Sequence, residues 1–351
     1  MNPYVGLVSS LRAAWLTGKT RAAEHRVSQL EALRRFLDEK KQPILDAMAS
    51  DMRKPPFEVE LSEIVLVKNE VNYALNNLSS WMKDEFVEKN LVTQLDTAFI
   101  RKEPYGVVLI IGAWNYPLNL ILVPLVGAIA AGNCVIIKPS EICSSTEKIL
   151  AETLPSYLDN SPDFARIISD KQFQRIRALL GSGRVAIGGQ TDERERYIAP
   201  TVLADVQPSE PAMQEEIFGP VLPIITVPNV DEAIAFINRR ERPLAMYVFA
   251  SDSKLVHRVL EQTSSGGFGA NDTMMQTTLI SLPFGGIGNS GLGSYHSKFS
   301  FDTFSHHRAC LLRSLGLETV NALRYPPYSE RKMGLVTSAF EIKRKGTCTL
   351  L

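Results

Sequence analysis

The sequence has few cysteines, and those it has follow no pairing pattern. Cys134, Cys143, Cys310 and Cys348 are the only four among 351 residues. Their spacing matches neither a disulfide framework nor a metal site. Sparse, irregularly placed cysteines are typical of reducing compartments, so we expect a cytoplasmic protein without a metal.

An excess of charge of one sign is also missing. The chain has 38 basic and 38 acidic residues, which gives a formal net charge of zero. A nucleic-acid-binding surface normally produces a basic excess, so this class of partner is excluded. The content of apolar residues, 45%, is that of a globular enzyme, and the length suits two domains.

Long uninterrupted apolar stretches are absent as well. Residues 105–137 have no charge and are numerous enough to span a membrane, but helix and strand breakers divide them. The breakers are Gly112, Asn115, Pro117, Asn119, Pro124, Gly132 and Asn133. The pattern predicts a βαβ unit, with buried parallel strands at 107–111 and 134–137 and a crossover helix at 117–131. Pro117 suits the first turn of that helix.

The rest of the chain is predicted to be mixed α/β. Apolar residues at helical spacing in the first hundred positions predict helices with one buried face. These residues are Leu30, Leu33 and Leu37 on one helix and Val71, Leu75 and Leu78 on another. Farther along, a helix at 172–180 and strands at 221–227 and 244–249 indicate a second α/β domain.

Polar residues follow both predicted strands, at the sheet edge where α/β proteins gather ligands. Asn115 lies in the loop after the first strand, where its amide could donate to an oxyanion on an attacked carbonyl. The alternative is an asparagine that stabilises the loop. Lys138, Ser140 and Glu141 follow the second strand, where a cation and a carboxylate suit ribose hydroxyls or a phosphate; solvated loop charges are the alternative.

Several ordered motifs resemble the family-3 branch of the aldehyde dehydrogenases over nearly the whole chain. They are MKDE at 82–85, NLVTQL at 90–95, IRKEPYG at 100–106, the segment 104–141 ending in KPSE, QEEIFGP at 214–220, LPFGGIG at 282–288 and FSFDTFSHH at 299–307. The resemblance implies an aldehyde dehydrogenase-like fold with a doubly wound NAD-binding domain. It also implies NAD- or NADP-dependent oxidation of medium- and long-chain fatty aldehydes.

The resemblance also assigns roles to individual residues. Asn115 would be the oxyanion donor, and Lys138 would contact the adenosine ribose. Glu216 and Phe218 would hold the nicotinamide ribose. The other implied cofactor contacts are Trp114, Ser140 and Glu141. Residues 90–102 resemble the segment that bridges the homodimer in this branch.

Three motifs of the resembling family are missing: FTGS of the cofactor site, ELGGK with the general-base glutamate, and GQ-x-C with the nucleophilic cysteine. The sequence before Asn160 resembles the end of a family helix, whereas the sequence from Ser161 resembles a segment well beyond the catalytic cysteine. We therefore expect an internal deletion between these two residues. The expected domains are 1–160, an incomplete NAD(P)-binding domain, 161–310, the remainder of the catalytic domain, and 311–351, a tail.

Without nucleophile and base, the chain is expected to be catalytically silent, either as a membrane-tethered binding protein or as a non-functional splice product, with cofactor binding weakened or lost. The alternative is an active dehydrogenase with an unrecognised arrangement, for which Cys143 is the only cysteine expected near the cofactor site. Missing central strands are also expected to leave sheet edges unpaired and apolar faces exposed, which favours aggregation.

The last four residues, CTLL, place Cys348 and a final leucine as in a geranylgeranylation box. Lys343, Arg344 and Lys345 precede it and would add attraction to anionic lipid. We expect anchoring on the cytoplasmic face of a membrane or on a lipid droplet. The alternative is a coincidental tail cysteine.

Overall fold

The computed structural model describes residues 4–89, 94, 96–158, 171–193, 197–313, 322, 325–327 and 329–340. The predicted deletion point, the basic residues 343–345 and Cys348 lie outside these ranges. The α-helices are α1 (Tyr4–Leu16), α2 (Ala23–Glu39), α3 (Lys41–Met52), α4 (Pro56–Val59), α5 (Val65–Trp81), α6 (Asn119–Ala131), α7 (Ser144–Thr153), α8 (Lys171–Leu179), α9 (Val230–Asn238), α10 (Ser253–Gln262), α11 (Ser297–Thr303) and α13 (Glu330–Phe340).

The strands form five small sheets within the described residues. They are β1 (Glu85–Phe86), β2 (Thr97–Pro104), β3 (Val107–Ile111), β4 (Cys134–Lys138), β5 (Arg184–Ile187), β6 (Thr191–Asp192), β7 (Tyr197–Ile198), β8 (Thr201–Ala204), β9 (Val221–Pro223), β10 (Ala245–Val248), β11 (Gly267–Ala270) and β12 (Ser305–Leu312). Their orders are β1-β2-β12, β3-β4, β5-β8-β9, β6-β7 and β10-β11.

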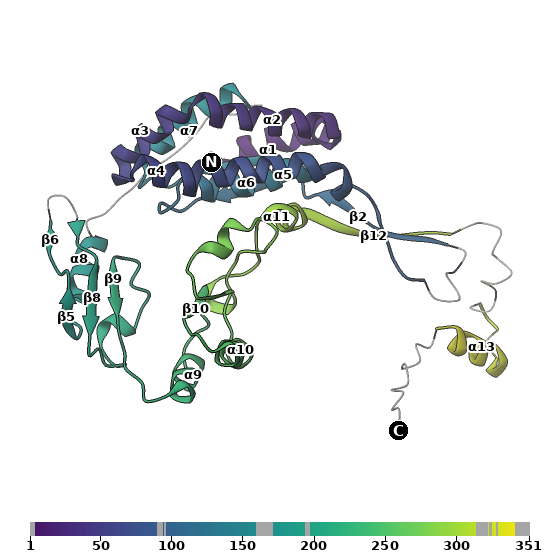
Figure 1. Ribbon diagram of the computed structural model, residues 1–351. Helices are drawn as coiled ribbons and strands as arrows, with labels where there is room; N and C mark the ends of the chain where they lie inside the picture. Colours follow the sequence, from purple (N-terminus) through teal and green to yellow (C-terminus); the bar gives the residue numbers. More distant parts are fainter. Residues whose placement is uncertain are drawn as a thin grey trace.

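Figure 1 shows α2, α3, α5, α6 and α7 gathered in one layer. The β5-β8-β9 sheet lies toward one end of this layer, and a long ribbon of β2 and β12 projects from the other. The main apolar core lies within the helical layer, and it includes the predicted residues Leu30, Leu33, Leu37 and Val71, all fully buried. Two smaller clusters support β8 with β9 and β10 with β11 separately. The predicted mixed α/β architecture is therefore confirmed, although its second part is divided into separate small sheets.

The predicted βαβ unit is present. β3 and β4 pair in parallel from Val107 opposite Cys134 to Ile111 opposite Lys138. The two strands form a sheet by themselves among the described residues. Ile110 faces the core, but Leu109 and Ile111 on the other face are exposed at 55% and 67%. The prediction of buried strands is therefore wrong for this face, because nothing among the described residues covers it. The predicted exposure of apolar faces and unpaired edges is confirmed here.

The predicted crossover helix begins later than expected. Leu118 is the N-cap of α6, so Pro117 lies outside the helix and not in its first turn. Pro124 lies inside the helix. The later start follows from hydrogen bonds that the Glu63 carboxylate accepts from the N–H groups of Leu118 and Asn119. No described helix combines the length and apolar character needed to cross a bilayer.

Helices α6 and α11 approach each other closely at Gly127. A Cβ atom added there would lie 2.3 Å from Ser300 Cβ and 2.9 Å from its carbonyl carbon. We expect Gly127→Ala to lower the free energy of unfolding by about 1–3 kcal/mol, because the added methyl group forces the two backbones apart. Urea unfolding checks this. Gly6→Ala is the control, since Gly6 in α1 has open space around it and alanine favours a helix. Equal stability changes in the two variants would contradict the prediction.

Candidate functional site

The βαβ unit brings the two predicted polar segments to one edge of the sheet. Gly112, directly after β3, donates its N–H to the carbonyl of Lys138 at the end of β4, over 3.0 Å. The loop with Asn115 and the segment from Lys138 to Glu141 therefore start side by side. This is the carboxyl end of parallel strands, where the sequence placed the site.

A contact between aromatic rings joins this edge to a segment far along the chain. The rings of Trp114 and Phe218 lie 5.5 Å apart in an edge-to-face arrangement. Both remain partly exposed, at 39% and 45%. Phe218 has a φ of 47°, a backbone conformation that is strained for a bulky residue, so its packing on Trp114 is maintained against a local cost. Two residues predicted to contact the cofactor are thus neighbours.

Asn115 is partly buried in the same loop. Its side-chain oxygen is shielded from solvent and has no hydrogen-bond partner among the described residues. A loop-stabilising asparagine would use this oxygen to accept a backbone N–H, so the structure gives no support to that alternative.

Cys143 lies beside this loop, as predicted, but its thiol is buried. Its Sγ donates to the carbonyl of Trp114 over 3.2 Å, and the residue is 1% exposed. Burial, assisted by the nearby carboxylates of Asp51 and Glu63, raises the pKa of the thiol to about 12. A reactive cysteine needs access and a lowered pKa, so the thiolate form is not available here.

The segment after β4 is held by internal contacts. Lys138 and Glu141 form an ion pair, and this bond to Lys138 lowers the pKa of the Glu141 carboxyl group. Ser140 is buried, and its hydroxyl accepts the N–H of Ile142 at 3.4 Å. Of the three predicted cofactor residues in this segment, only Lys138 and Glu141 are open to solvent.

Glu216 is exposed in the segment that precedes Phe218. Arg175 of α8 holds this segment by donating to the carbonyls of Glu216, at 3.3 Å, and Ile217, at 2.8 Å. It also forms an ion pair of 2.9 Å with Glu215. This role of Arg175 could not be predicted from the sequence, because an arginine in an exposed helix usually remains solvated.

A dinucleotide needs contacts for two riboses and a pyrophosphate. Lys138 and Glu141 have the donor and acceptor groups that ribose hydroxyls require, and Phe218 has a face for a planar ring. A pyrophosphate would favour the N-terminus of α7, directly after this segment. The Asp51 carboxylate already accepts the N–H groups of Ser145 and Thr146 there, at 2.8 and 2.7 Å. Lys138 and Glu141 therefore fit a ribose. The N-terminus of α7 does not fit the pyrophosphate, because Asp51 occupies its N–H groups.

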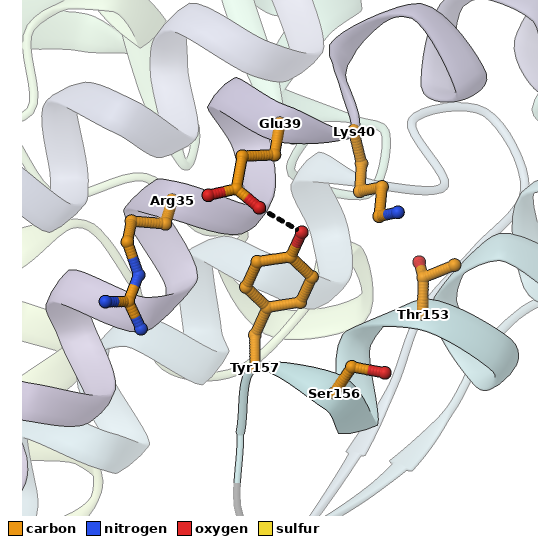
Figure 2. A pocket seen from close by; sticks show the side chains of 6 residues that line it. All are labelled: Arg35, Glu39, Lys40, Thr153, Ser156 and Tyr157. Carbon is orange, nitrogen blue, oxygen red and sulfur yellow. Dashed lines mark hydrogen bonds between the residues drawn. The ribbon is translucent and has the colours of Figure 1, made fainter.

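A separate cavity of about 420 Å³ lies between the C-terminal ends of α2 and α7 (Figure 2). Its lining residues are Arg35, Glu39, Lys40, Thr153, Ser156 and Tyr157. The Tyr157 hydroxyl donates to Glu39 over 2.5 Å, as the dashed line shows. No predicted site residue lines this cavity. The described residues also contain no group of three or more histidine, cysteine or acidic side chains suited to a metal.

A protein-family model described as "Aldehyde dehydrogenase family" matches residues 8–157 and 153–310. The chain belongs to the aldehyde dehydrogenase family. Human aldehyde dehydrogenase family 3 member B1 is 48% identical over 469 residues, with 100% of each chain covered. Mouse family 3 member B2 is 45% identical, with 99% of this chain and 97% of the relative covered. The chain is therefore a family 3, member B-like aldehyde dehydrogenase, as the motifs indicated.

Solved aldehyde dehydrogenases share the fold. Staphylococcus aureus AldH, in a substrate-bound state, is 30% identical with a TM-score of 0.88, over 97% of this chain and 100% of that one. The indole-3-acetaldehyde dehydrogenase AldA of P. syringae, in complex with NAD+, has a TM-score of 0.74 at 18% identity, over 88% of each chain. This second likeness concerns the fold alone.

Proposed function

We propose that this chain is a catalytically silent member of family 3, which retains part of a ligand-binding surface without the groups that oxidise an aldehyde. The observation that carries the proposal is the burial of Cys143, which is 1% exposed and whose Sγ donates to the carbonyl of Trp114 over 3.2 Å. Covalent oxidation of an aldehyde begins with attack by a thiolate, which this cysteine does not supply.

An internal deletion explains why no other thiol replaces it. The alignment with the human relative spans 469 positions, whereas this chain has 351 residues, so gaps in this chain make up the difference. The two family-model matches meet at residues 153–157, shortly before the junction expected between Asn160 and Ser161. Both observations support the loss of a central segment, where the missing ELGGK and GQ-x-C motifs would belong.

The remaining surface suits a carbonyl compound and one end of a nucleotide. The Asn115 amide would donate to a carbonyl oxygen, and Lys138 with Glu141 would contact ribose hydroxyls. Trp114, Glu216 and Phe218 would border the nicotinamide end. NAD or NADP, when bound, supplies the acceptor for a hydride. The carboxylate of Glu141 favours a 2′-hydroxyl over a 2′-phosphate, and hence NAD.

We expect no NADH formation when the purified chain is mixed with NAD and a long-chain aldehyde, and no change in Cys143→Ala. Absorbance at the NADH band checks this, with Cys310→Ala as the matched control and calorimetry to measure cofactor binding. Turnover that Cys143→Ala abolishes and Cys310→Ala leaves intact would establish the second candidate function, an active NAD(P)-dependent fatty aldehyde dehydrogenase. The contact between Trp114 and Phe218 favours that candidate, since it assembles part of a site.

We also propose that Cys348 is prenylated and anchors the protein to a cytoplasmic membrane face or a lipid droplet. The box CTLL and the basic residues at 343–345 support this. Mass spectrometry of the C-terminal peptide from animal cells should find the mass of a geranylgeranyl group, and Cys348→Ser should move the protein to the soluble fraction. Free Cys348 throughout would remove the anchor. A homodimer remains a proposal from the family resemblance of residues 90–102, some of which lie outside the described residues.

A further inference from the structure

A buried ion pair lies against the loop that carries Asn115. Lys54 Nζ and Glu63 Oε1 are 2.7 Å apart, and their side chains are 7% and 0% exposed. Glu63 belongs to a five-residue π-helix, Glu60–Ile64, inserted between α4 and α5. Such insertions change the direction of side chains and occur often at functional sites. Here the π-helix contains Glu63, whose carboxylate is directed at the start of α6.

Glu63 holds the start of α6. Its second oxygen, Oε2, accepts the N–H groups of Leu118 at 3.2 Å and Asn119 at 2.9 Å. The first N–H groups of a helix have no partner within it, and a carboxylate there also favours the helix dipole. The Asn119 side chain adds a bond of 3.1 Å to the carbonyl of Ser62. The downstream end of the loop is therefore fixed from the π-helix.

Lys54 holds the middle of the loop. Its ammonium group lies 4.1 Å from the centre of the Tyr116 ring, which is a cation–π distance. Tyr116 directly follows Asn115. At the upstream end, the carbonyl of Trp114 accepts the bond from Cys143. The residues on both sides of Asn115 are thus held by buried groups, while no described residue bonds to the Asn115 side-chain oxygen.

We propose that Lys54 and Glu63 are positioning residues that hold the Trp114–Pro117 loop, and with it the Asn115 amide, at the carboxyl end of β3. A buried ion pair is seldom the most stable way to fill a core, since both charges lose their hydration. A role in holding a hydrogen-bond donor, the Asn115 amide, at a ligand site is a reason to retain a buried ion pair. The role in ligand binding that we assign to the ion pair rests on the proposed function. The contacts of Lys54 and Glu63 with the loop do not depend on it.

The test is fluorine NMR of the full chain labelled with 5-fluorotryptophan. The chain has three tryptophans, so three signals arise, and Trp114→Phe assigns that of Trp114. In Glu63→Leu, the Trp114 signal should shift and broaden, whereas those of Trp15 and Trp81 should not move. In Glu63→Gln, which keeps an acceptor oxygen for the α6 N–H groups, the Trp114 signal should return toward its original position.

Glu70→Leu is the matched control. Glu70 is also a buried carboxylate that caps a helix, but it bonds to Ser297 at the start of α11. The Trp81 ring packs on Phe301 of α11 at 5.5 Å. Glu70→Leu should therefore move the Trp81 signal and leave Trp114 in place, the opposite of the pattern expected for Glu63→Leu.

Tyr116→Leu provides a second route if Glu63→Leu does not fold. It removes the ring over Lys54 without unpairing a buried charge, and the Trp114 signal should again shift alone. An unchanged Trp114 signal in folded Glu63→Leu or Tyr116→Leu, or equal shifts of all three signals, would overturn the proposal. If calorimetry detects no binding of NAD while the Trp114 signal shifts as stated, the positioning role of Lys54 and Glu63 is supported and the proposed ligand-binding function is contradicted.

Discussion

Replacing Lys54 with methionine is expected to lower the free energy of unfolding by about 3–5 kcal/mol at neutral pH, because it leaves Glu63 buried and charged without its partner. Glu63 is fully buried, and Lys54 is the cation that bonds to it. Burial already raises the pKa of this carboxyl group, and Lys54 limits the rise more than the N–H groups of Asn119 and Leu118 do. Methionine fills a similar volume, so packing changes contribute little.

Urea unfolding at neutral and mildly acidic pH would measure this effect. The defect should shrink as the pH falls, because a protonated Glu63 has no charge left to compensate. Lys68→Met is the matched control: Lys68 pairs with Asp38 at 2.6 Å, but that pair is open to solvent and should contribute less than about 1 kcal/mol. Equal losses in the two variants would contradict a special role for the buried pair.

Replacing Glu70 with glutamine is expected to remove a pH-dependent contribution of about 3 kcal/mol to the free energy of unfolding. Glu70 is 1% exposed, and one of its oxygens accepts the N–H and hydroxyl of Ser297 at 2.7 and 3.0 Å. Its other oxygen has no hydrogen-bond partner among the described residues. Burial raises the pKa of this carboxyl group from 4.5 to about 7.

Because the folded pKa lies above the unfolded one, the protonated acid stabilises the folded chain. This contribution is complete below pH 4.5 and is lost as the pH rises through 7. The stability of the original chain should therefore fall relative to Glu70→Gln over this window, as followed by urea unfolding. Glu103→Gln is a control of opposite sign, since its bond with Arg308 lowers the pKa of Glu103. A constant difference between the original chain and Glu70→Gln would exclude the buried acid as the cause.

The βαβ unit could be predicted because its signals are local. Branched apolar residues and breakers define β3 and β4 within a residue of their observed ends, and the helix between them follows from its apolar content. The position of the Asn115 loop at the end of β3 followed directly. The start of α6 could not be predicted, because it depends on Glu63, which no nearby sequence indicates.

The same limit applies to the rest of the site. The packing of Phe218 on Trp114, the hold of Arg175 on the 215–217 segment and the buried state of Cys143 all arise from contacts between distant segments. The sequence correctly predicted that Cys143 lies near the site, but the burial of its side chain is not revealed by the spacing of residues. The motifs therefore indicated which residues lie close together, and the structure showed how far each is buried and which groups it contacts.

The two-stranded sheet of β3 and β4 has a consequence for the lifetime of the protein in a cell. Leu109 and Ile111 are accessible on its outer face, and both strands have a free edge among the described residues. Surfaces of this kind are bound by chaperones and directed to proteases, which act continuously on incompletely covered chains. We expect the steady-state amount of this protein to be determined by its rate of degradation more than by its rate of synthesis, so that a proteasome inhibitor would raise its level more than that of human family 3 member B1.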